Sequence, residues 1–181
     1  KLKQLDQFGD FEFCGYIEGN DITKGDTNVI VTEKEMLEAI DPTIYQIESN
    51  DITTIRASVP MFLLSKYIRD NTDIKVIFSG EGSDEASGSY LYFHNAPNPK
   101  EFQQECIRLL RDVRYFDVLR SDKTTAGAGL EIRVPYFDKE FMKYYMGIPP
   151  EKKMIRDGME KYLLRKAFES YLPEEIVWRR K

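Results

Sequence analysis

The residues best suited to chemistry are gathered in one short stretch, residues 77–85, which reads IFSGEGSDE. Its glycines and serine would let the backbone come close to a nucleotide phosphate. Three carboxylates, Glu81, Asp84 and Glu85, stand in the same stretch. Carboxylates there can hold Mg²⁺ on phosphates, meet an ammonium group or take a proton from an attacking amine. The plainer interpretation is that Asp84 and Glu85 only stabilise the start of a helix. Spacing alone does not decide between this structural role and a role in ligand binding or catalysis.

Several familiar kinds of site are excluded by what the sequence lacks. The stretch is neither the GxGxxG fingerprint of a dinucleotide-binding oxidoreductase nor a Gly-Lys-Ser/Thr phosphate loop. The single histidine, His94, excludes a His-rich zinc site and a pair of acid/base histidines, and no nucleophile-elbow pattern accompanies it. We expect His94 to be a hydrogen-bonded residue beside the stretch. Cys14 and Cys106 form neither a disulfide framework nor a metal pattern, which fits a reducing, cytoplasmic compartment.

The first elements of the chain are short. Residues 1–27 carry no sustained period, although one short strand fits around residues 11–13. A β-branched run at residues 28–32 predicts a second strand, and a Thr-x-x-Glu capping box at residues 32–35 starts a short helix. The pair Asp41-Pro42 would then cap and start another helix.

The segment that leads into the glycine stretch predicts an α/β fold. A helix is expected over residues 58–70, with Pro60 near its start. The apolar run IKVIF at residues 74–78 predicts a strand buried on both faces of a parallel sheet. Ligands of such sheets bind beyond the carboxyl ends of the strands, which is where residues 79–85 lie. The order strand, helix, strand and loop therefore favours an α/β layer fold with a ligand site in that loop.

The downstream half of the chain is predicted to be almost entirely helical. Asn98 and Pro99 give a cap and a first turn, Asp138 caps a later helix, and the last clear helix covers residues 158–171. One helix carries an apolar stripe, in which Cys106 fits a core position better than a reactive thiol. The stripe consists of Phe102, Cys106, Leu109, Leu110 and Val113.

Length and charge narrow the class of protein further. The chain has 181 residues, enough for one domain with a hydrophobic core. Its net charge of -5 argues against a nucleic-acid binder, which would show a basic face. No apolar run reaches the roughly 18 residues expected of a membrane span.

Long motifs in a fixed order resemble one family, the glutamine-hydrolysing asparagine synthetases of the eukaryotic type. These motifs are DITTIRASVP, SGEGSDE followed by YLYFHNAPNP, DVLRSDKTTAGAGLEIRVPYFD and GMEKYLLRKAFESYLPEEIVWRRK. The resemblance covers residues 28–181 and implies an ATP-pyrophosphatase-type α/β domain with a largely helical C-terminal half. It also implies the reaction: ATP and L-aspartate give β-aspartyl-AMP, which ammonia from a glutaminase domain converts to L-asparagine. The expected cofactors are ATP and Mg²⁺.

The same resemblance assigns roles residue by residue. Ser79 and Gly80 match the pair that contacts ATP. Glu81 matches the residue needed for the adenylate stage and for deprotonating ammonia, and Asp84 matches a ligand to Mg²⁺ or to substrate. Lys161, in GMEKYLLR, matches the lysine that steadies the phosphates. Two further members of the aspartate or pyrophosphate site are Thr53 and Arg56.

The chain departs from the family in what it omits. It has no N-terminal Cys-Gly and no glutaminase domain, and it lacks the Ser-Gly-Gly-x-Asp-Ser loop that cradles pyrophosphate. We therefore expect a fragment, with residues 1–27 unassigned, residues 28–181 forming a partial synthetase domain, and no activity on its own. The alternative is a nucleotide-binding relative without catalysis that acts as a binding or regulatory protein. No nucleic-acid or membrane partner is expected, and a homodimer is left open.

Overall fold

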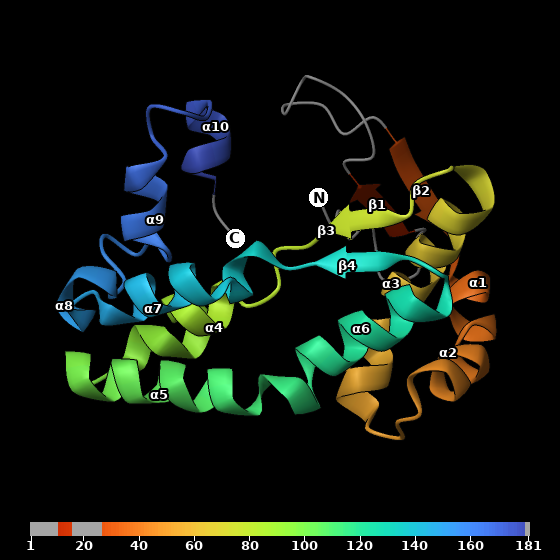
Figure 1. Cartoon of the computed structure of the whole chain (residues 1–181), viewed down its shortest axis with the longest axis horizontal. Coiled ribbons are helices and arrows are strands. Elements are labelled where there is room, and N and C mark those ends of the chain that lie inside the picture. Colours follow the sequence, from red (N-terminus) through yellow and green to blue (C-terminus); the bar gives the residue numbers. More distant parts are fainter. Residues whose placement is uncertain (1–10, 16–26, 180–181) are drawn as a thin grey trace. The chain divides into compact units, whose positions relative to one another are not determined.

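The computed structural model describes residues 11–15 and 27–179, which form two compact units (Figure 1). The first unit holds the described residues up to Ile77 together with residues 116–133. The second holds residues 78–115 and the chain from Val134 onward. The remaining residues, which include most of the segment left unassigned from sequence, lie outside the described part, so the two units are described one at a time.

The first unit combines two small sheets with a layer of helices. Strand β1 pairs with β2 in antiparallel fashion, with Phe11 opposite Val31. Strand β3 pairs with β4, and both arrows point the same way in Figure 1. The elements are β1 (Phe11–Gly15), β2 (Thr27–Val31), α1 (Glu33–Glu38), α2 (Ile40–Ile47), α3 (Ile52–Asn71), β3 (Val76–Phe78), α6 (Asp117–Gly127) and β4 (Glu131–Arg133). The α/β character expected from sequence is present in this unit.

Two helix starts differ in how well the sequence predicted them. The capping box of α1 is confirmed, because Thr32 Oγ1 accepts from the Glu35 amide at 3.2 Å and Glu35 Oε2 accepts from the Thr32 amide at 2.8 Å. The predicted start of α2 is wrong. This helix begins at Ile40, so the Asp41-Pro42 pair lies inside its first turn. Proline is tolerated there because the first-turn amides have no intrahelical partner.

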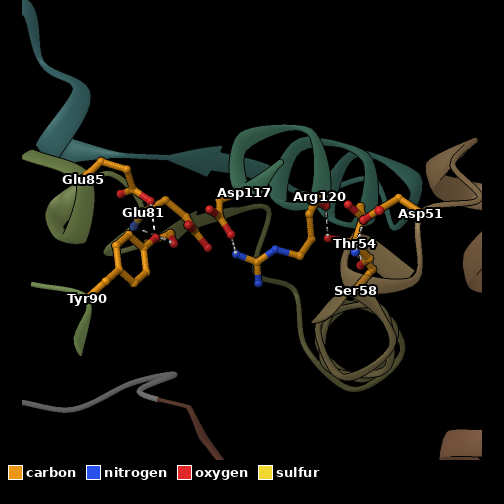
Figure 2. Close-up of polar contacts among 10 residues, drawn as sticks. Asp51, Thr54, Ser58, Glu81, Glu85, Tyr90, Asp117 and Arg120 are labelled. Carbon is orange, nitrogen blue, oxygen red and sulfur yellow. Dashed lines mark hydrogen bonds and ion pairs between the residues drawn. The ribbon is translucent and has the colours of Figure 1, made fainter. Parts of the chain in front are cut away.

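Helix α3 is longer than predicted. Asp51 caps it, with Oδ2 accepting from the Thr54 amide at 2.7 Å (Figure 2), and the helix runs for 20 residues. Pro60, expected near its start, is inside it. A proline there removes only one intrahelical bond, the one to the carbonyl of Arg56. Burial of the flanking turns evidently outweighs that loss, and this tertiary contribution is invisible in local sequence signals.

The helices of the first unit bury many hydroxyl side chains. On α3, Ser58 Oγ donates to the Thr54 carbonyl at 2.7 Å (Figure 2), and on α6, Thr125 Oγ1 donates to the Ser121 carbonyl at 2.7 Å. Each of these two hydroxyls is thereby satisfied on its own helix, whereas the buried hydroxyls of Thr43 and Ser121 have no hydrogen-bond partner in the part of the chain that is described. The buried hydroxyl residues of α2, α3 and α6 are Thr43, Thr54, Ser58, Ser65, Ser121, Thr124 and Thr125. A small apolar cluster closes the unit: Ile68, Ala128 and Leu130, with Leu64, Ile74 and Ile77 packed on it.

Strand β3 is present but covers only Val76–Phe78 of the predicted residues 74–78, and its expected burial on both faces is wrong. Val76 is 38% exposed and Phe78 is 74% exposed. Ile77 packs on the cluster of Ile68, Ala128 and Leu130, whereas Val76 and Phe78 alternate with it on the other face, which is left exposed. Strand β4 itself was not predicted, because residues 131–133 lie in a segment that reads as helical and the strand is only three residues long.

The second unit is helical around an aromatic core. Phe102 packs edge-on against Phe93 with ring centroids 5.1 Å apart, and Cys106 is fully buried beside them. The predicted caps Asn98 and Asp138 are confirmed, since their side chains accept from Glu101 and Phe141 amides. The elements are α4 (Ser83–Ser87), α5 (Pro99–Asp112), α7 (Lys139–Gly147), α8 (Pro150–Lys153), α9 (Tyr162–Ala167), α10 (Glu174–Val177) and short 3₁₀ turns η1 (Leu91–Asn95), η2 (Val113–Tyr115) and η3 (Pro135–Phe137).

The last predicted helix, residues 158–171, is wrong in its length. Helix α9 covers only Tyr162–Ala167, because Gly158 and Lys161 both have left-handed backbone, with φ of 69° and 56°. In the part of the chain that the structure describes, no helix is both long and apolar enough to cross a bilayer.

The buried thiol of Cys106 gives a testable pH dependence. Burial raises the pKa of this thiol to about 12, against about 8.5 in an unfolded chain. We expect native Cys106 to react with iodoacetamide at pH 8 more than about 10³ times slower than a free thiol, because the thiolate is the nucleophile. Peptide mass spectrometry before and after addition of urea measures this. Native labelling at the rate of the unfolded chain would contradict the burial.

The raised pKa of Cys106 also makes the free energy of unfolding depend on pH. Above the unfolded pKa the unfolded thiol loses its proton while the native thiol keeps it. The contribution of Cys106 to the free energy of unfolding is therefore complete below about pH 8.5. It declines as the pH rises toward the native pKa of about 12.

Candidate functional site

The glycine stretch forms a tight loop between β3 and α4. Gly82 has φ 89°, and a Cβ on it would lie 2.7 Å from the ring of Phe137, so only glycine fits. A Cβ on Gly80 would meet nothing within 4 Å, which leaves its backbone accessible. Ser79 Oγ accepts from the Glu81 amide at 3.3 Å and so bends the chain between the two glycines. The loop therefore combines one glycine required by packing with one that leaves space for a ligand.

The three carboxylates of the stretch have different surroundings. Glu85 is 3% exposed and accepts a hydrogen bond from the Tyr90 hydroxyl (Figure 2), which makes it a structural tie between α4 and the turn that follows. Glu81 lies in the loop itself and is partly exposed. Glu85 thus has a structural role through Tyr90, although among the described residues no side chain caps the start of α4 as the plainer interpretation would require, whereas Glu81 is placed where a ligand could reach it.

Asp84 meets a cation from a distant part of the chain. Lys161 Nζ lies 2.5 Å from Asp84 Oδ1 and donates to Ser83 Oγ at 2.8 Å. The same Asp84 oxygen accepts from Ser89 Oγ at 2.6 Å. The structure therefore brings together Asp84 and Lys161, two of the residues singled out from sequence. Their side chains remain 25% and 22% exposed, so the ammonium group can still be approached.

The donor set around Asp84 does not fit a resident Mg²⁺. The oxygen that would bind the ion already faces the Lys161 ammonium at 2.5 Å. Among the described residues, no group of three His, Cys, Asp or Glu side chains is close enough to hold a metal. Mg²⁺ usually rests on one or two carboxylates plus substrate phosphates. The metal role of Asp84 stays a prediction, and the geometry favours an ammonium partner instead.

Thr53 and Arg56 belong to the first unit and the glycine loop to the second. Both side chains are exposed on α3, whereas Thr54 and Ser58 of the same helix are buried. The helix is therefore held by one face and presents Thr53 and Arg56 on another.

Sequence reasoning missed three residues of this site. Ser83 accepts a hydrogen bond from Lys161, and Ser89 donates one to Asp84. The only hint of them in the sequence was that both are small hydroxyl residues near Asp84. Tyr136 lies near Asp84: burial and the charge of that carboxylate raise the pKa of its hydroxyl. Nothing in the local sequence connects residue 136 with residue 84, because the fold alone makes them neighbours.

Comparison with known proteins defines the family. Residues 21–101 and 94–181 match the family model described as asparagine synthase. The chain belongs to this family. The asparagine synthetases (glutamine-hydrolyzing) of rat and human are both 53% identical to it over 155 residues, and that of chicken is 52% identical. The alignments cover 84% of this chain but only 28% of these relatives, so the chain spans less than a third of their length.

Proposed function

We propose that this chain is part of a synthetase domain that amidates L-aspartate to L-asparagine with ATP, through a β-aspartyl-AMP intermediate. The observation that carries the proposal is the Lys161–Asp84 pair beside an open Gly80–Glu81 loop, in a chain 53% identical to asparagine synthetases (glutamine-hydrolyzing). Because the chain spans only 28% of those relatives, the activity is proposed for the longer protein.

The proposed chemistry has two steps. The β-carboxylate of aspartate attacks the α-phosphorus of ATP, and the bond to pyrophosphate breaks. Ammonia then attacks the acyl carbon of β-aspartyl-AMP, forming the C–N bond while the C–O bond to AMP breaks. The nitrogen must lose a proton on the way, and Glu81 is the carboxylate we assign to accept it.

The remaining residues would bind and position the nucleotide and aspartate. Ser79 and the accessible backbone of Gly80 contact the nucleotide. The Lys161 ammonium offsets charge that develops on the phosphates. Asp84, by its 2.5 Å contact, holds that ammonium in place. Completing the aspartate or pyrophosphate site is the role we assign to Thr53 and Arg56.

We place residues 28–181 in a partial domain of the ATP-pyrophosphatase type. Ammonia would be channelled to it from a glutaminase domain, and Mg²⁺ would accompany the nucleotide, supplying charge neutralisation on its phosphates. A cytoplasmic location and a homodimer are parts of the same proposal, each supported by the resemblance alone.

The test is pyrophosphate release by the full-length gene product supplied with ATP, L-aspartate and ammonium. We expect release that depends on aspartate and yields one asparagine for each pyrophosphate, measured by a coupled assay and by mass spectrometry of the product. Omission of aspartate is the matched control. Release at the background rate of ATP hydrolysis in every mixture would overturn the ligase and favour a nucleotide-binding protein without catalysis.

A further inference from the structure

The segment that carries Lys161 has an unusual backbone. Three residues between positions 157 and 161 are left-handed: Asp157 at φ 54°, Gly158 at 69° and Lys161 at 56°. A residue with a side chain is disfavoured in this region and stays there only when its surroundings fix it. Lys161 sits at the end of this segment, as the residue that precedes α9. Its ammonium can meet Ser83 and Asp84 only if that backbone is held.

The neighbouring residue, Glu160, is the anchor of the segment. Glu160 is 7% exposed although it is a carboxylate. Its Oε1 lies 2.6 Å from Nε2 of His94, on η1, and its carbonyl accepts from Arg165 Nε at 2.8 Å. An ionised carboxylate can only accept, so against ionised Glu160 the donor of this contact is His94 Nε2. Burying a carboxylate costs free energy unless it is paired and hydrogen-bonded, and the His94 imidazole supplies such a contact to Glu160.

The Glu160–His94 and Lys161–Asp84 contacts hold two consecutive residues of the chain. Residue 160 is tied to η1 and residue 161 to the first turn of α4, and both ties lie within the second unit. Because the side chains of Glu160 and Lys161 are held by η1 and by α4, the backbone that joins them is kept from relaxing to a right-handed or extended conformation. The His94 side chain is 35% exposed and contacts Glu160, so we infer that it acts on Lys161 through that carboxylate.

We propose that His94 is a positioning residue for Lys161. By holding the buried Glu160 carboxylate, it fixes the left-handed backbone that delivers the Lys161 ammonium to Ser83 and Asp84. The importance of Lys161 for catalysis rests on the proposed function, whereas its positioning by His94 does not.

The test is trace acylation of lysines with acetic anhydride in the chain itself, read by peptide mass spectrometry. In His94→Ala we expect Lys161 to be acylated roughly two to five times faster than in the parent, the range for losing a partly exposed ion pair. His94→Gln, whose amide can still donate to Glu160, is expected to return toward the parent rate. Asn95→Ala, on the same exposed turn, is the matched control and is expected to leave the rate unchanged.

Two further lysines make the outcome decisive. Lys66 is exposed and normalises the reagent, whereas Lys153 is 1% exposed and reports whether the second unit stays folded. A faster Lys161 with Lys153 still protected supports the proposal. An unchanged Lys161 rate in His94→Ala overturns it, and so does a joint rise of Lys153 and Lys161, since that would show a general loss of folding.

Activity separates this inference from the function on which it builds. In the full-length protein we expect His94→Ala to lower kcat more than it raises KM for ATP, because the Lys161 ammonium that offsets developing phosphate charge is displaced while Glu81 is untouched. If the acylation result holds but no aspartate-dependent pyrophosphate release exists, the positioning stands and the proposed function fails.

Discussion

Replacing Glu81 by glutamine in the full-length protein is expected to lower the rate of asparagine formation by about 10²- to 10⁴-fold, the usual contribution of a general base. Glutamine keeps the size and the hydrogen-bonding reach of glutamate but cannot accept a proton at neutral pH. The loop itself is set by Gly82 and by the Ser79 contact to the backbone of residue 81, neither of which the substitution removes. The measurement is kcat for asparagine at saturating ATP and aspartate.

Glu101→Gln is the matched control for that change. Glu101 is an exposed acid in the first turn of α5, and its backbone amide rather than its carboxylate makes the capping contact to Asn98. We expect its kcat to stay within about twofold of the parent, as for most exposed substitutions. A Glu81→Gln enzyme that is as active as this control would remove Glu81 from the mechanism.

The second large effect is expected in stability rather than in catalysis. Phe102→Ala is expected to lower the free energy of unfolding of the second unit by about 3–5 kcal/mol, the range for emptying a buried aromatic site. Phe102 is 1% exposed and packs against Phe93, and a Cβ on Gly88 would lie 2.4 Å from its ring. Such close contacts leave a cavity that the surroundings cannot easily fill. A unit of ordinary stability would thereby lose a large part of its free energy of unfolding.

The single tryptophan provides the measurement. Trp178 belongs to the second unit and lies 5.6 Å from the ring of Tyr162, so its fluorescence during urea unfolding reports this unit. Ile107→Ala is the control on the same helix, because Ile107 is 44% exposed, and we expect it to cost under about 1 kcal/mol. Equal losses in the two variants would show that α5 does not pack as described.

Local signals predicted the parts of the fold that are locally determined. The capping box at Thr32, the caps at Asn98 and Asp138, and the apolar stripe with Cys106 follow from side chains a few residues apart, and all are confirmed. The start of α3 was misplaced because Pro60 is a strong local signal for a helix start. The structure overrides it through a cap at Asp51 and burial along the whole helix.

The candidate site also contains one feature that local sequence signals predicted and one that they did not. Glycine at position 82 was indicated by the loop pattern, and its packing against Phe137 explains the need for it. The partnership of Asp84 with Lys161 spans 77 residues of sequence, and no periodicity or spacing connects them. The family resemblance placed both residues in one site, but it assigned Asp84 to substrate or metal, whereas the fold gives it the lysine.

The hydroxyl-lined contact between α3 and α6 also has a thermal consequence. The heat capacity of unfolding rises with newly exposed apolar surface and falls with newly exposed polar surface. The burial of Ser58, Thr54 and Thr125 on these helices therefore adds little to it, in contrast to the aromatic core around Phe102. The stability of the α3–α6 contact should thus curve less with temperature, and it should weaken less on cooling than the aromatic core does.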